Sequence, residues 1–177
     1  MKVTIPYTPR KQQAFIHTEL DKHRFSVLCC HRRFGKTVML INHLIKCCMM
    51  NKNHQPRFAY IAPTYSQAKK IAWDYLKFYT KGLPNTKYNE TELRCDFFNG
   101  SRITLLSSEN PDSIRGIYLD GVVCDEASQI SRELIDEVIR PAIADRKGWM
   151  SLCSTPKGMN NIFYDMYLKA QQEKDWF

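Results

Sequence analysis

The sequence contains no apolar run of about 18 residues, the length that a transmembrane helix needs. Its first residues, MKVTIP, lack the apolar stretch of a signal peptide. No repeat and no low-complexity linker is visible. What is present is a chain of 177 residues, 44% hydrophobic and 25% charged, which predicts one soluble globular domain with a substantial core.

Cysteine pairing patterns are also missing. None of the seven cysteines forms a C-x-x-C pair, and four stand in adjacent doublets, which make poor disulfide partners. Cys29, Cys124 and Cys153 lie within apolar runs, so we expect them to be small buried core residues. We therefore expect a reducing, cytosolic setting without disulfides or zinc.

Acidic residues are the scarcer charged class, because 18 Asp and Glu stand against 26 Lys and Arg, a net charge of +8. This balance suits a polyanionic partner such as nucleic acid, although a solvated basic surface has the same composition. The largest basic cluster is a loose one, made of Lys69, Lys70, Lys77, Lys81 and Lys87.

Short apolar runs alternate with segments of helical periodicity, which predicts a mostly parallel α/β sheet with helices on both faces. A hairpin, 93–98 with 102–106, is predicted around Asn99-Gly100, a strong signal for a tight primed turn. The helix at 132–144 is expected to be interrupted or to end near Pro141. The other predicted strands are 25–29, 57–62, 120–124 and 149–153, and the other predicted helices are 10–21, 36–50, 66–79 and 160–172.

Gly35-Lys36-Thr37 follows a predicted strand and opens a predicted helix, which is the context of a phosphate-binding P-loop. Backbone N–H groups at the helix start would bind phosphate oxygens, Lys36 the β- and γ-phosphates, and the Thr37 hydroxyl Mg²⁺. The glycine that usually opens the loop is missing, and Cys30 stands in its place. Taken alone, the motif could therefore be a chance GKT on a surface turn.

Two further strand ends complete the pattern. The apolar run 122–124 ends in Asp125-Glu126, where Asp125 would hold Mg²⁺, usually through water, and Glu126 would deprotonate the attacking water. Ser154-Thr155 ends the strand at 149–153, which we expect to lie between the other two strands. A hydroxyl there can sense the γ-phosphate; the alternative is a polar turn. Together, the three segments predict an ATP-hydrolysing site.

The motif set resembles the ATPase domain of the large terminase subunit of tailed bacteriophages, the motor that pumps DNA into empty capsids. The resemblance implies a P-loop NTPase fold of the RecA/ASCE-like type, with a mostly parallel sheet flanked by helices and a small β-hairpin insertion. It covers nearly the whole chain and rests on four stretches in order, HRRFGKT, APTYSQAKKIAWDYLK, SIRGIYLDGVVCDEA and STPKG.

Matched residue by residue, the resemblance implies further roles. Arg32 matches a P-loop arginine proposed to act in cis, and Arg115 matches an arginine proposed to reach the neighbouring subunit's nucleotide. A guanidinium neutralises charge on the γ-phosphoryl group in the transition state. Arg33 is the weaker candidate, facing DNA or an acid instead, and Arg115 could be a surface loop residue. Phe34 and Gly35 fall within the matched nucleotide-binding loop.

The segment YTPRKQQAF resembles the family's adenine-recognition segment, although it could also be an ordinary amphipathic helix start. A planar amide can give one hydrogen bond to adenine and accept another. We expect Gln12 to read the base, with Gln13 as the alternative, and Tyr7 or Arg10 to stack on it.

The resemblance implies ATP and Mg²⁺ as cofactors, double-stranded DNA held mainly by its phosphates, and the portal protein and small terminase subunit as partners. It also implies the host cytoplasm and a ring assembly, with a monomer as the alternative for an isolated domain. Residues 1–177 are expected to be one ATPase domain without the family's C-terminal nuclease, ending on exposed aromatics at 176 and 177. No second metal cluster is predicted among Asp112, Asp120, Glu133 and Asp136.

Two other functions fit parts of the pattern. A DExx-box helicase lobe would share Asp125-Glu126-Ala127-Ser128 and the adenine glutamine, but helicases hold nucleotide between two RecA-like lobes and 177 residues allow one. A non-enzymatic DNA-binding adaptor with a vestigial P-loop would not need Lys36, Thr37 and the acidic pair intact.

Overall fold

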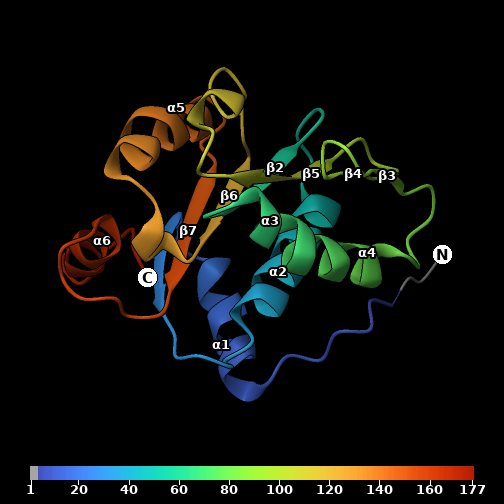
Figure 1. Cartoon of the computed structure of the whole chain (residues 1–177). Coiled ribbons are helices and arrows are strands. Elements are labelled where there is room, and N and C mark those ends of the chain that lie inside the picture. Colours follow the sequence, from blue (N-terminus) through green and yellow to red (C-terminus); the bar gives the residue numbers. More distant parts are fainter. Residues whose placement is uncertain (1–3) are drawn as a thin grey trace.

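A computed structural model describes residues 4–177 of the chain. The first three residues, part of the stretch without a signal-peptide pattern, lie outside this range. Within it, one sheet of seven strands has the order β1-β7-β6-β2-β5-β4-β3, with the first five parallel and β4 and β3 antiparallel at one edge (Figure 1). The strands are β1 (Phe25–Cys29), β2 (Arg57–Ala62), β3 (Lys87–Asn89), β4 (Arg94–Asp96), β5 (Arg102–Ser107), β6 (Gly121–Asp125) and β7 (Trp149–Ser154).

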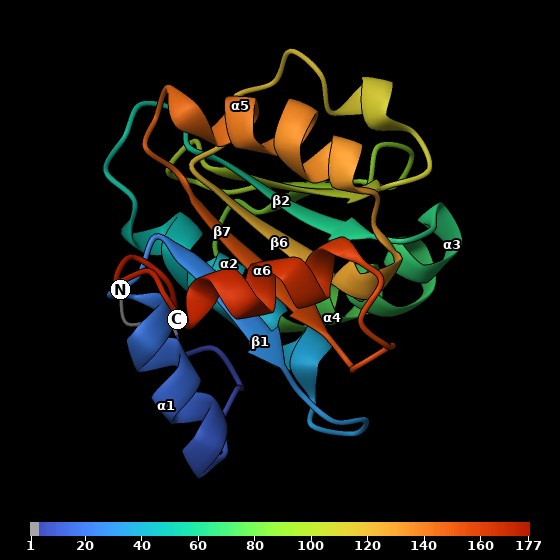
Figure 2. The same cartoon turned by 90° about the vertical axis from the view of Figure 1, so that its left-hand side faces the viewer.

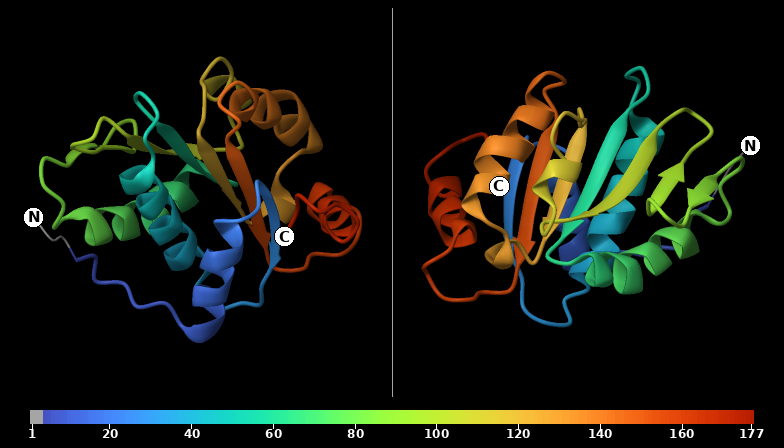
Figure 3. Two further views of the ribbon diagram at one scale, coloured as in Figure 1. Left: turned by 180° about the vertical axis from the view of Figure 1, so that it is seen from behind. Right: turned by 45° about the horizontal axis from the view of Figure 1, so that its top comes forward.

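Helices cover both faces of the parallel part of the sheet (Figures 1 and 3). One face carries α1, α2 and the α3–α4 segment, and the other carries α5 and α6 (Figure 2). The predicted α/β class with helices on both faces is therefore confirmed. The helices are α1 (Lys11–Leu20), α2 (Lys36–Met50), α3 (Tyr65–Gln67), α4 (Asp74–Thr80), α5 (Arg140–Ala144) and α6 (Ile162–Ala170).

Two of the predicted helices contain a wider π turn. The segment η1 (Ala68–Trp73) joins α3 to α4, and η4 (Leu134–Ile139) leads into α5. The helix at 132–144 does not end at Pro141, because α5 continues η4 to Ala144, but the π turn directly before the proline interrupts the regular α pattern there, as expected. Such π segments occur often beside functional sites, and η1 begins soon after the carboxyl end of β2.

The hairpin of β4 and β5 is present, but its turn is not of the predicted primed type. Phe97 and Ser101 are joined by a backbone hydrogen bond of 2.9 Å, and the N–H of Gly100 donates to the Phe97 carbonyl over 3.0 Å. Gly100 alone has a positive φ, of 79°, whereas a type I′ turn would need one at Asn99 as well. The loop is thus a type I turn closed by a left-handed glycine.

Two predictions about burial were wrong. Cys29, expected in the core, is exposed, because it is the last residue of the edge strand β1; Cys124 and Cys153 are buried as predicted. The terminal aromatics were expected to be exposed, yet Trp176 is only 6% exposed and stacks on Phe25.

The end of the chain extends the sheet beyond β1. The N–H of Val27 donates to the Phe177 carbonyl over 2.7 Å, and the N–H of Phe177 donates to the Phe25 carbonyl over 3.0 Å. This short parallel bridge covers part of an edge that would otherwise present unpaired backbone groups. Among residues 4–177, no helix has the length and apolar character that crossing a membrane requires.

Gly121 sets the packing between β6 and β7. It pairs with Trp149, and a Cβ atom added at position 121 would collide with the indole ring. That ring is itself packed against His43 and Phe58, with centroids 5.2 and 6.3 Å apart, so it has little room to move. Glycine at 121 is therefore required by close approach rather than by backbone conformation.

We predict that Gly121→Ala lowers the free energy of unfolding by about 1–3 kcal/mol, because the added methyl overpacks the indole. Gly82→Ala is the matched control, since nothing lies within 4 Å of a Cβ there, and it should change stability by less than about 0.5 kcal/mol. Urea unfolding of both variants measures the difference. Equal losses of stability in the two variants would show that the Trp149 ring moves aside without destabilising the fold.

Candidate nucleotide-binding site

The residues that the sequence marks for chemistry meet at the carboxyl ends of three adjacent strands. The P-loop follows β1, Asp125 and Glu126 end β6, and Ser154 and Thr155 end β7. Strand β7 lies between β1 and β6, as predicted for this class of ATPase. Because the three strands are parallel, all their carboxyl ends open onto the same edge of the sheet, where ligands bind in such folds.

The P-loop is built without its opening glycine. Cys30 is buried, and its N–H donates to the Ser154 carbonyl over 3.0 Å, so that position continues the pairing of β1 with β7. The left-handed conformations fall later in the loop, at Arg33 with a φ of 64° and at Gly35 with a φ of 84°. Lys36 then begins α2, so the loop delivers the helix start that the motif requires.

The first turn of α1 fastens this loop. The Arg10 guanidinium and the Gln13 amide both donate to the Phe34 carbonyl, the latter over 3.0 Å. A Cβ at Gly35 would lie 2.9 Å from each of the two donating side-chain ends, which can move aside, so the positive φ of Gly35 is the main reason for glycine there. The Phe34 ring is buried in the core, so only the backbone of this predicted site residue borders the loop surface.

Asp125 collects donors from three elements. Thr37 on α2 donates its hydroxyl to Asp125 Oδ2 over 3.0 Å, and Tyr60 on β2 donates to the same oxygen. The N–H of Glu126 donates to Oδ1 over 2.9 Å. Burial and the negative charge of Asp125 raise the pKa of Tyr60 well above its usual value, so the phenol remains a donor.

The donor set fits a magnesium ion. A hydroxyl and a carboxylate 3.0 Å apart are hard oxygen ligands of the kind that Mg²⁺ takes, with water and phosphate oxygens filling the remaining positions. Within residues 4–177, no group of three or more His, Cys, Asp or Glu side chains is placed to hold a metal ion by itself.

Glu126 lies beside the P-loop lysine. Its φ of 50° is left-handed, and its carboxylate accepts from the Thr155 hydroxyl over 3.4 Å and lies 3.9 Å from Lys36 Nζ. Ser154 is fully buried, and its hydroxyl contacts Ser128 at 2.8 Å. Of the two predicted sensors, Thr155 therefore faces the acid, and Ser154 ties β7 to the segment after β6.

A cavity of about 280 Å³ lies beside these groups. Arg32, Thr37, Asp125, Glu126 and Thr155 line it, whereas Arg33, Lys36 and Ser154 do not. The sequence did not mark several other lining residues, which are Tyr60, Gln67, Ile71, Gln129 and Lys157. Lys157 and Gln129 could have been suspected, because each follows closely on a marked strand end, but Tyr60 lies inside an apolar run that is typical of a core strand.

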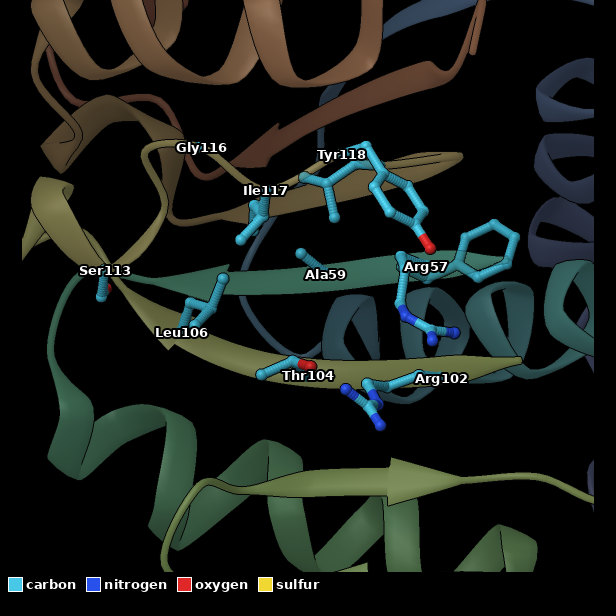
Figure 4. Close-up of a pocket in the computed structure, with 11 residues that line it drawn as sticks. Arg57, Ala59, Arg102, Thr104, Leu106, Ser113, Gly116, Ile117 and Tyr118 are labelled. Carbon is cyan, nitrogen blue, oxygen red and sulfur yellow. The ribbon is translucent and has the colours of Figure 1, made fainter. Parts of the chain in front are cut away.

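A second cavity, of about 310 Å³, lies on the face of β2 and β5 that α5 leaves uncovered (Figure 4). Arg57, Arg102 and Tyr118 line it, together with apolar side chains of the same strands. Its volume is slightly larger, but it contains no predicted site residue and none of its lining residues comes from β1, β6 or β7, whose carboxyl ends carry the predicted site residues. We therefore place the candidate site at the cavity beside Glu126.

The two glutamines of the predicted adenine segment do not lie as expected. Gln12, expected to read the base, is exposed, whereas Gln13 is buried against the P-loop and also accepts from the Arg10 N–H over 3.0 Å. Tyr7 donates to or accepts from His17 Nε2 at 3.0 Å, and the Arg10 guanidinium lies over the Phe34 ring. Helix phase thus brings Gln13, not Gln12, to the loop.

Arg115 lies outside the cavity. Its guanidinium pairs with Asp112 at 3.3 Å and with Glu133 at 3.7 Å, and about half of its side chain is exposed. Asp120 accepts from the Arg57 N–H, and Asp136 pairs with Arg140, so each of these acids has a local partner. The structure therefore separates Arg115 from the candidate site of its own chain.

Comparison with known proteins relates the chain to phage proteins. The large terminase subunits of Thermus phage G20c and Escherichia phage T5 are each 29% identical to it, over 92% and 90% of the chain. The chain spans only 36% and 37% of their respective lengths.

Solved structures have the same fold. The large terminase ATPase domain of Thermus phage P74-26 is 25% identical with a TM-score of 0.79, over 97% of this chain and 80% of that one. The large terminase of another thermophilic bacteriophage, in complex with ADP, is 17% identical with a TM-score of 0.76, over 94% of this chain and 44% of that one, and shows the fold alone.

A family model described as the N-terminal part of the T4likevirus-type terminase large subunit matches residues 31–176. The match includes the P-loop, the acidic pair after β6 and the hydroxyl pair after β7. Because it covers most of the chain, this protein belongs to the terminase large subunit family.

Proposed function

We propose that this chain binds ATP with Mg²⁺, hydrolyses it, and uses the turnover to move double-stranded viral DNA into a procapsid. The observation that carries the proposal is the meeting of Thr37, Asp125, Glu126 and Thr155 around one cavity at the strand ends, with Lys36 Nζ 3.9 Å from the Glu126 carboxylate. Family membership favours this function over a helicase lobe or a non-enzymatic adaptor. A thermophilic bacteriophage's large terminase, which has the same fold, was solved with ADP.

The chain's own groups suffice for binding and for proton transfer. Backbone N–H groups at the start of α2 and the Lys36 ammonium would hold the phosphates. Thr37 and Asp125 would hold Mg²⁺, which when bound neutralises charge on the β- and γ-phosphates. The Glu126 carboxylate would orient the attacking water and take its proton, while Thr155, 3.4 Å from that carboxylate, would register whether the γ-phosphate is present.

The contact between Lys36 and Glu126 suggests how binding prepares the base. Their charged groups are 3.9 Å apart, so each partly neutralises the other before nucleotide enters. Phosphate oxygens would draw Lys36 away, which leaves the Glu126 carboxylate with the Thr155 hydroxyl as its neighbour. The freed carboxylate would then be able to contact the attacking water.

The arginines and the glutamines take separate roles in this proposal. Arg32 lines the cavity and would act on the phosphates in cis, and Arg115 would act on the nucleotide of a neighbouring subunit in a ring. Gln13 replaces Gln12 as the proposed adenine contact, because it is the glutamine that lies against the loop. The portal protein, the small terminase subunit and DNA remain proposed partners, and DNA cleavage is not part of the proposed activity of this chain.

We predict that Glu126→Gln lowers ATP turnover by about 100- to 10,000-fold, because it removes the general base while keeping the shape of the side chain. Nucleotide affinity should change little. Phosphate release with excess DNA measures turnover, and Glu173→Gln, on an exposed acid outside the site, is the control. Turnover in the variant equal to that of the wild type would exclude hydrolysis at this site.

Arg32→Ala should lower turnover by about 1,000-fold and leave the nucleotide dissociation constant within about 10-fold, because the guanidinium acts mainly on transition-state charge. Arg33→Ala is the matched variant, one residue along the same loop but outside the cavity. It should lower both turnover and nucleotide affinity by less than Arg32→Ala does. Steady-state hydrolysis and fluorescent-nucleotide titration separate the two quantities. Equal, small effects would return both arginines to the role of surface residues.

Turnover per subunit should rise with protein concentration in the wild type and stay flat in Arg115→Ala, because the arginine must come from a second copy. Measuring phosphate release across a wide concentration range, with wild type and variant side by side, tests this. A wild-type rate per subunit that does not depend on concentration would contradict action in trans.

A further inference from the structure

The hydroxyl of Tyr60 is a polar group in an otherwise apolar layer. It lies in the middle of β2, is 2% exposed, and shares its face with Phe58, an aromatic residue without a hydroxyl. Strand β2 is the neighbour of β6, and Tyr60 is in register with Val123. Paired residues of parallel strands face the same way, so Asp125, two residues beyond Val123, lies on the same face and within reach of the phenol.

The hydrogen bonds of Asp125 can be counted. An ionised carboxylate offers about four acceptor positions. Two on Oδ2 are occupied by the hydroxyls of Tyr60 and Thr37, and one on Oδ1 by the N–H of Glu126. About one position on Oδ1 stays open, and the three donors come from β2, α2 and the backbone after β6, so the carboxylate cannot turn without breaking at least one bond.

Thr37 cannot fix the carboxylate alone. In the proposed function its hydroxyl oxygen is also a ligand of the cation, so this one group serves both the cation and Asp125. Tyr60 has no such second role and is held by the core on β2. A donor that does not move keeps the open position of Asp125 pointing in one direction in both states of the site.

We infer that Tyr60 is a positioning residue for the divalent cation, holding Asp125 Oδ2 so that one acceptor position on Oδ1 remains available to the cation's water shell. The inference rests on the proposed function, in which Thr37 and Asp125 hold Mg²⁺. The alternative is that the hydroxyl merely satisfies a buried carboxylate, which would affect stability and every ligand alike.

The test is Tyr60→Phe, which removes one oxygen and keeps the ring in the core. Mn²⁺ is titrated into the protein with a non-hydrolysable ATP analogue, and bound Mn²⁺ is measured by electron paramagnetic resonance. We expect the Mn²⁺ dissociation constant to rise about 10-fold, which is the usual lower bound for losing a group that orients a metal ligand. The affinity for a fluorescent ADP analogue in EDTA should stay unchanged.

Tyr88→Phe is the matched control, because it also removes a hydrogen-bonded tyrosine hydroxyl. Tyr88 lies on β3, at the opposite edge of the sheet from β1, and its hydroxyl contacts that of Thr80 on α4 at 2.9 Å. It should leave the Mn²⁺ affinity at the wild-type value. An unchanged Mn²⁺ affinity in Tyr60→Phe would overturn the inference. So would an equal loss of metal-free nucleotide binding, since that is the result expected of a purely structural hydroxyl.

Asp125→Asn distinguishes this inference from the function on which it rests. If the wild type binds Mn²⁺ no better than Asp125→Asn, the proposed metal site itself is wrong. If the wild type binds Mn²⁺ far better than Asp125→Asn and Tyr60→Phe equals the wild type, the metal site stands and only the role of Tyr60 is refuted.

Discussion

The charge of Asp125 is the constraint on which the site depends. Its side chain is nearly buried, at 7% exposure, and a buried anion is costly unless donors replace the water it has lost. Those donors come from Tyr60 on β2, Thr37 on α2 and the backbone of Glu126. The carboxylate thereby joins β6 to β2 and to α2. One charge thus sets the local packing, and it lies where the proposed cation would bind.

The left-handed backbone conformation of Glu126 is the second feature on which the site depends. In an extended strand, successive side chains point to opposite faces, so Asp125 and Glu126 could not both serve one cavity. A φ of 50° at Glu126 breaks that alternation and brings its carboxylate to Lys36 and Thr155. Such a conformation costs about 1–3 kcal/mol. The hydrogen bond from the Gln129 N–H to the Glu126 carbonyl, at 2.9 Å, and the turn that it closes help to hold it.

Local patterns predicted six of the seven strands, the main helices and the strand ends of the candidate site, because periodicity and loop motifs depend on neighbours in sequence; the edge strand β3 was not predicted. Features that depend on distant neighbours were missed. Tyr60 gains its role only because β2 lies beside β6, and Cys29 is exposed only because β1 is an edge strand. The contact of Gln13 rather than Gln12 with the loop depends on the phase of α1, and which of the two contacts adenine stays a prediction. The turn at Asn99 differed because Gly100 alone takes the left-handed conformation.

The missing glycine of the P-loop also follows from this geometry. An opening glycine is needed where the chain must turn at once with a positive φ. Here Cys30 has no positive φ, is buried, and donates to the Ser154 carbonyl, so it acts as one more residue of the β1–β7 ladder. The turn is made afterwards, by Arg33 and Gly35. Moving the turn along the loop removes the need for glycine at its first position, and it places Arg32 on the cavity while Arg33, in the left-handed conformation, stays outside it.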